Sequence, residues 1–246
     1  IFGVAFGNLL QGVPFHLDND LRAFYTGSFW ALLNPFALAA GLLSLSMLIM
    51  HGAVYLQLKT EGNINRRCKK VVTVATVFAL VIFAAAGIWV TNMDGYQITT
   101  EVLPNAPSNP LTKIVQKAPG LWLDNYENYP VLWIIPAMAF VAGAVTIVLS
   151  KIERPGLAFI TSSLAVTSII LTAGVAMFPF LLPSSSALNS SLTVWDASSS
   201  LSTLKIMFWS AVIFLPIVFA YTSWVFRVLR GKITAEQIHQ TDHTAL

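Results

Sequence analysis

One histidine stands inside an apolar stretch of the sequence, and it is the first residue to consider for chemistry. His51 closely follows Met47 and Met50 in a run that is otherwise almost free of polar residues. An imidazole in a membrane helix ligates haem iron when a second ligand, such as a methionine sulfur, faces it. Methionine fills apolar gaps far more often than it ligates iron. We therefore interpret His51 as a neutral histidine hydrogen-bonded within a helix bundle, and we keep haem or quinone contact as the weaker candidate role.

The remaining histidines do not form a recognisable metal centre. His16 lies beside Asp18 and Asp20, but three ligands in one short turn without a fourth are weak evidence for a metal, so a solvated acidic loop is expected. His239 and His243 have the spacing of one helical face without an intervening Glu, which excludes a zinc hydrolase motif. We predict no catalytic residue and no metal site in this chain.

The acidic residues lie outside the long apolar stretches. A charge within lipid costs several kcal/mol unless it is paired or hydrated, so an acid inside a span usually marks function. All acids of this sequence fall in connections or in the C-terminal tail, and we expect no proton relay across the chain. They are Asp18, Asp20, Glu61, Asp94, Glu101, Asp124, Glu127, Glu153, Asp196, Glu236 and Asp242.

The composition assigns the chain to the membrane. Apolar residues make up 56% of it and charged residues only 10%, with a mean hydropathy of +0.70. A soluble globule needs more polar surface than this. The net charge of +3 does not indicate nucleic acid, because the basic residues flank apolar stretches. The single cysteine, Cys68, allows no disulfide within the chain.

Five apolar segments are long enough to cross a bilayer as helices, and none alternates as a barrel strand does. They are 32–58, 71–91, 131–149, 157–182 and 206–226. Residues 1–10 read as the end of a sixth span, so we expect a truncated sequence. The predicted fold is an all-α, polytopic bundle forming one transmembrane domain over residues 1–246.

The connections give an orientation and some local structure. Alternate connections carry ten and four Lys and Arg residues, and the side with ten is expected to be cytoplasmic, with the C-terminus. In the large outer loop 92–130, Pro104, Pro107 and Pro110 favour an extended chain. The following stretch 111–123 is expected to be a helix lying on the outer surface. In the segment 195–200, Asp196 and the serines are expected to cap the last span.

Several strings resemble subunit II of the bacterial cytochrome bd-type ubiquinol oxidases, and they occur in order along nearly the whole chain. They are GNLLQGVPF at 7–15, LLNPF at 32–36, HGAVYLQLKT at 51–60, MFPFLLPSS at 177–185, SLTVWDASSS at 191–200, and TLKIMFW through LPIVFAYTSW near the end. An ordered set of this kind is specific. The resemblance implies nine helices in the whole subunit, of which this chain supplies the end of the fourth and the last five.

The resemblance also implies a function. The expected partner is subunit I, which holds two b-type haems and one d-type haem, oxidises quinol and reduces dioxygen to water in the bacterial inner membrane. This chain would bind no haem itself. A structural quinone, with no residue assigned, and a small accessory subunit are left open. The alternatives are a fragment of a secondary transporter, for which Pro136 and Pro179 give faint support, and a purely structural scaffold.

Overall fold

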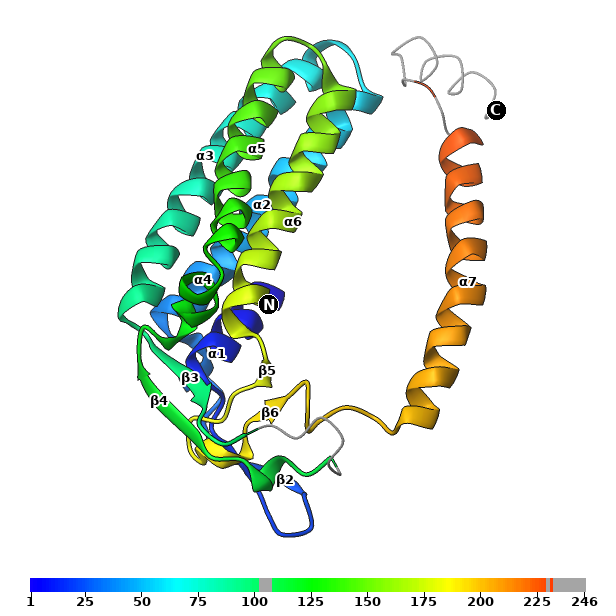
Figure 1. Cartoon of the computed structure of the whole chain (residues 1–246). Coiled ribbons are helices and arrows are strands. Elements are labelled where there is room, and N and C mark those ends of the chain that lie inside the picture. Colours follow the sequence, from blue (N-terminus) through cyan, green and yellow to red (C-terminus); the bar gives the residue numbers. More distant parts are fainter. Residues whose placement is uncertain (102–107, 229–230, 232–246) are drawn as a thin grey trace.

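The computed structural model describes residues 1–101, 108–228 and 231, and it is built mainly of long helices (Figure 1). The expected positions Pro104, Pro107, His239 and His243 lie outside the described residues. The α-helices are α1 (Phe2–Gln11), α2 (Pro35–Lys59), α3 (Gly62–Asn92), α4 (Asp124–Asn128), α5 (Ile134–Lys151), α6 (Pro155–Met177) and α7 (Leu201–Val228). In the described part of the chain, five helices are long and apolar enough to cross a membrane. The predicted all-α polytopic fold is confirmed.

Three of these helices have an end that the apolar pattern did not predict, and one of them is α7, which begins at Leu201 rather than near Ile206. Helix α3 begins at Gly62 rather than near Val71, because its basic first turns continue the helix outside the apolar run. Helix α6 ends at Met177 rather than near Leu182, which is a correction to the expected span. Pro179 has no backbone N–H to continue the helical hydrogen bonds, and the apolar residues that follow it form a strand instead.

Three short antiparallel ribbons gather at one end of the bundle, which we call the ribbon end (Figure 1). The strands pair as β1 (Phe15–Leu17) with β2 (Ala23–Tyr25), β3 (Asp94–Ile98) with β4 (Val115–Pro119), and β5 (Phe180–Leu182) with β6 (Leu192–Thr193). Short 3₁₀ turns lie between the paired strands or lead from this end into the helices: η1 (Trp30–Leu33), η2 (Pro110–Thr112), η3 (Leu121–Leu123), η4 (Pro130–Trp133) and η5 (Leu188–Ser190).

The expected surface helix over residues 111–123 is wrong. Strand β4 occupies the middle of that stretch, with Ile98 of β3 opposite Val115. Two of the apolar residues that matched a helical spacing, Val115 and Trp122, are instead buried in a hydrophobic core at the ribbon end. The indole of Trp122 donates a hydrogen bond to the Leu10 carbonyl at 3.0 Å, which ties the loop 92–130 to α1. A partner strand elsewhere in the chain therefore overrides the local periodicity.

Helices α2, α3, α5 and α6 pack side by side, and α1 packs on α2 (Figure 1). Opposite the ribbon end, the connections α2–α3 and α5–α6 lie together, which we call the turn end. There Lys69 Nζ of α3 is 2.6 Å from Glu153 Oε1 in the α5–α6 turn. Helix α7 stands apart from this group in Figure 1, and none of its residues is buried.

Candidate functional site

His51 lies on α2 and is oriented by α6. Its Nδ1 is 2.9 Å from the hydroxyl of Ser162. That hydroxyl also donates to the carbonyl of Phe159 at 2.9 Å. Because a hydroxyl has a single proton to donate, Nδ1 of His51 is the donor to the Ser162 oxygen when that proton goes to the Phe159 carbonyl. The Phe159 ring, 4.6 Å away between centroids, packs on the imidazole.

The methionines beside His51 fill the core instead of facing it. Met47 packs in a buried cluster with Ala79 and Ala139, and Met50 packs in another cluster of small residues. The described residues therefore give His51 no evident methionine partner for an iron. The two roles considered for His51, a neutral bundle histidine or a weaker cofactor contact, both stay predictions.

Further polar side chains join the helices toward the turn end. The amide of Gln57, 1% exposed, donates to the Ser150 hydroxyl at 2.8 Å, and that hydroxyl donates back to the amide oxygen at 3.0 Å. The hydroxyls of Thr146 and Thr161 are 2.8 Å apart between α5 and α6. Such neutral pairs satisfy polar groups that lipid cannot solvate. The sequence pattern missed Gln57, although its amide stands alone in an apolar run.

Every acid that the structure describes lies outside the five long helices. Glu61 and Glu153 are at the turn end, and the other described acids belong to the ribbon end. The predicted placement is confirmed for these residues, while Glu236 and Asp242 lie outside the described range. Among the described residues, no chain of carboxylates enters the bundle.

The acidic loop near His16 is an ordered turn. Asp18 Oδ1 accepts hydrogen bonds from the backbone amides of Asp20 at 2.9 Å and Arg22 at 2.8 Å. The His16 ring stacks on Phe24, with 5.4 Å between ring centroids. The described part of the chain brings no three His, Cys, Asp or Glu side chains together in a geometry for a metal ion.

The ribbon end contains a buried ion pair that the sequence did not reveal. Lys113 Nζ lies 2.7 Å from Asp196 Oδ2, with side-chain exposures of 7% and 13%. The ammonium also donates to the Pro110 carbonyl at 2.7 Å. Asp196 in turn accepts from the amide of Thr193 at 2.9 Å and from its hydroxyl at 2.8 Å. Burial lowers the pKa of Lys113, and the hydrogen bond with Asp196 opposes that shift.

The expected role of Asp196 as a helix cap is therefore wrong. Helix α7 begins at Leu201, and the residue that accepts from its first turn is Ser200, whose hydroxyl is 3.4 Å from the Thr203 amide. Asp196 instead fastens the segment before α7 to the loop containing Lys113. No local signal marks Lys113, because its partner lies far away in the sequence.

These features define a class of protein: a polytopic, mainly helical membrane protein whose bundle is held by neutral polar pairs. A family model described as cytochrome bd terminal oxidase subunit II matches residues 1–229. The chain belongs to this family.

Its relatives include both close and distant members. The chain is 48% identical over 245 residues to cytochrome bd-I ubiquinol oxidase subunit 2 of Escherichia coli K12, covering 99% of this chain and 65% of that protein. It is 45% identical over 244 residues to a probable cytochrome oxidase subunit 2 of Haemophilus influenzae, with 99% and 65% covered. A Bacillus subtilis cytochrome bd ubiquinol oxidase subunit 2 is 23% identical over 242 residues, with 96% and 61% covered. The chain thus spans about two thirds of the length of these relatives.

A solved structure supports the same fold. The bd oxidase from Geobacillus thermodenitrificans aligns with a TM-score of 0.65 at 13% identity, covering 93% of this chain and 59% of the matched chain. At this identity the likeness concerns the fold alone. The family match gives no support to a transporter fragment.

Proposed function

We propose that this chain is the haem-free second subunit of a bd-type quinol oxidase. It supports a subunit I that holds two b-type haems and one d-type haem, oxidises quinol and reduces dioxygen to water in aerobic respiration. The observation that carries this proposal is the family match over residues 1–229. The activity belongs to the complex, and this chain supplies no catalytic residue.

The chemistry of the bundle supports a sheltering role. In the described residues, no acid lies within the long helices, and the buried amide of Gln57 is paired with Ser150. A helix bundle without acidic side chains in its long helices excludes water and places no negative charge next to a neighbouring redox centre. The unburied apolar residues of α7, such as Phe214 and Trp224, leave a long surface for lipid and for subunit I in a heterodimer. A small accessory subunit is compatible with the same surface.

The proposed location is the bacterial inner membrane, with the C-terminus in the cytoplasm and residues 1–246 forming one transmembrane domain. The contact between Lys69 and Glu153 supports this orientation, because it brings two Lys- and Arg-rich connections to one end. The outer loop 92–130 then belongs to the ribbon end, where Tyr96 donates to the Gln11 carbonyl at 3.2 Å. Fusions of alkaline phosphatase to the C-terminus should be inactive, and an active fusion would reverse the orientation.

Haem ligation is assigned to subunit I, as the family resemblance implies. Met47 and Met50, the methionines that neighbour His51, pack in apolar clusters, which supports a chain without a His–Met pair of haem ligands. A structural quinone remains part of the proposal for the family without an assigned residue here.

The test is spectroscopic. Membranes from a strain that lacks the full-length gene should lose the d-type haem band and quinol oxidase activity, and the restored gene should return both. The control strain carries the empty vector and an intact second terminal oxidase, so that growth does not depend on the result. An unchanged haem band and unchanged quinol oxidation in the deletion strain would refute the proposed function.

A further inference from the structure

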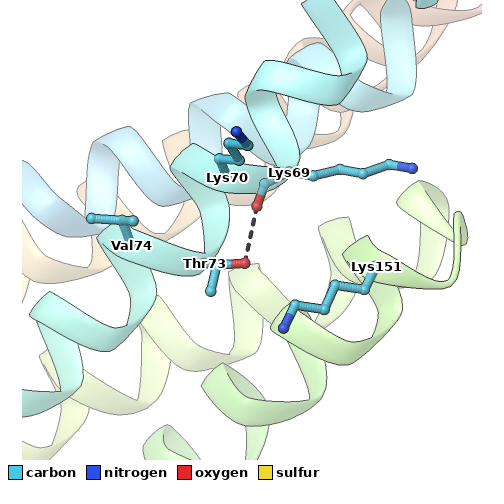
Figure 2. A pocket seen from close by; sticks show the side chains of 5 residues that line it. All are labelled: Lys69, Lys70, Thr73, Val74 and Lys151. Carbon is cyan, nitrogen blue, oxygen red and sulfur yellow. Dashed lines mark hydrogen bonds between the residues drawn. The ribbon is translucent and has the colours of Figure 1, made fainter.

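A basic groove lies at the turn end between α3 and α5. Lys69, Lys70, Thr73 and Val74 of α3 line it together with Lys151, the last residue of α5, around a volume of about 390 Å³. Figure 2 shows the three lysine side chains extending in different directions from the two helices, with Thr73 between them. The aliphatic parts of these side chains therefore form most of the groove surface, and the ammonium groups lie at their flexible ends.

The charges of this groove are only partly neutralised by the protein. Lys69 is paired with Glu153. Neither Lys70 nor Lys151 has an ion-pair partner among the described residues. Both side chains are exposed, so their ammonium groups remain available to an anion.

The depth of the groove matches that of lipid headgroups. The apolar run from Val71 to Val90 of α3 is about 30 Å long at the helical rise, which equals the thickness of the hydrocarbon layer. Lys70 immediately precedes this run, and Lys151 ends a membrane helix beside it. Basic pockets between helices at this level bind anionic headgroups.

A second, apolar groove continues from the basic one. It lies between α2 and α3, has a volume of about 400 Å³, and shares Lys70 and Val74 with the basic groove. From Lys70 to Phe78 it extends about 12 Å along α3 at the helical rise. The other side chains that line it are Leu42, Leu45, Ser46, Ile49, Val71 and Ala75. A free phosphate ion would leave this apolar part unused, whereas an acyl chain fills it.

Thr73 specifies the headgroup further. Its hydroxyl proton is given to the Lys69 carbonyl at 3.0 Å, so its oxygen is left as an acceptor. A headgroup that carries its own hydroxyl can donate to that oxygen while its phosphate faces the lysines. We propose that the joined grooves bind one phosphatidylglycerol molecule, with its phosphate between Lys70 and Lys151 and one acyl chain between α2 and α3.

The probe for this site is phosphatidylglycerol with a diazirine in the middle of one acyl chain, added to the purified native complex in phosphatidylcholine nanodiscs. Illumination should label peptides that contain residues 42–49 and 71–78. Phosphatidylcholine carrying the same diazirine should label them weakly, and inorganic phosphate should not compete with the labelling. Equal labelling by the two lipids, or competition by phosphate, would overturn the proposal.

Variants separate the charges from the apolar groove. The double variant K70Q/K151Q should need about 30-fold more phosphatidylglycerol for half-maximal labelling, a factor of about five for each lysine. The matched control K117Q/K205Q removes the same charge at positions that line neither groove, and it should label as the unmodified protein does. Unchanged labelling of K70Q/K151Q, or the same loss in the control, would contradict the assignment.

A second variant keeps the test decisive if the double variant does not assemble. Val74→Trp retains both lysines and fills the junction of the two grooves, and Val74 is 69% exposed, so the larger ring does not disturb the core. Labelling of residues 71–78 should fall at least tenfold. Full labelling of Val74→Trp would show that the acyl chain lies elsewhere.

Discussion

Replacing Asp196 by Asn should loosen the ribbon end far more than its place before α7 suggests. The change keeps an oxygen that accepts from the Thr193 amide, but it removes the charge that faces Lys113. The Lys113 ammonium, 7% exposed, would keep only the Pro110 carbonyl at 2.7 Å as a neutral partner. A buried cation without a counter-ion is strongly unfavourable.

The expected cost follows from the burial of the pair. Removing one partner of a buried ion pair costs roughly 3–5 kcal/mol, and the 13% exposure of Asp196 favours the lower limit. A loss of about 3 kcal/mol raises the local opening constant by about 150-fold, since each tenfold factor corresponds to about 1.4 kcal/mol. Backbone amides of residues 188–197 should then exchange with deuterium about 150 times faster.

The same pair predicts a dependence on pH. Burial lowers the pKa of Lys113 below its ordinary value of 10.5. Between the lowered pKa and 10.5 the unfolded segment binds more protons than the folded one, so this group makes local stability rise with pH in that window. Asp196→Asn removes a group that raises the pKa, and the window should therefore begin at a lower pH in the variant. Exchange rates corrected for intrinsic chemistry measure this shift.

The neighbouring pair of Lys117 and Asp94 provides the matched control. Its atoms are 3.3 Å apart, but the side chains are 32% and 49% exposed. Exposed pairs contribute about 1 kcal/mol or less, so Asp94→Asn should accelerate exchange in β3 and β4 by no more than about fivefold. Equal effects of the two substitutions would refute the reasoning from burial.

Three further outcomes are expected. His51→Ala should leave the haem content of the assembled complex unchanged, as read from its optical spectrum, and loss of one haem signal would give His51 a cofactor role. Gln57→Leu, which leaves the Ser150 hydroxyl without its amide partner, should lower stability by about 0.6 kcal/mol in a dodecyl sulfate titration; no change would mean that the pair contributes nothing. Burial raises the pKa of Tyr96 to about 12 from 10.0. Because the unfolded tyrosine loses its proton first, stability should fall as pH rises through this window, and Tyr96→Phe should remove that decrease.

The bundle could be predicted from the sequence because membrane helices depend on a local property. Apolar length alone identifies a span, since lipid requires each segment to satisfy its own backbone hydrogen bonds. The incorrect predictions concern segments outside the membrane-spanning helices, where a segment can form its backbone hydrogen bonds with another segment. Phe180–Leu182 is as apolar as the helix before it. It lies beyond the end of that helix, however, and forms an antiparallel strand pair with β6.

The structure of the ribbon end could largely not be predicted from the sequence, because it depends on contacts between segments that are distant in the chain. Val115 and Trp122 follow a helical spacing, but their burial depends on β3 and on α1. Lys113 and Asp196 are unremarkable charges until the fold brings them within 2.7 Å of each other. Long-range pairing of this kind leaves no local periodicity, so only the three-dimensional arrangement reveals it.

The strings that carry the family resemblance contact one another at the ribbon end. Asn34 of LLNPF donates to Asn8 of GNLLQGVPF at 3.0 Å. Ser184 of MFPFLLPSS hydrogen-bonds the Phe15 carbonyl, and its neighbour Ser185 donates from its amide to Val13 at 3.0 Å. These contacts join α1 and the start of β1 to the start of α2 and to the residues that follow β5. The resemblance therefore reports on how this end of the bundle is assembled.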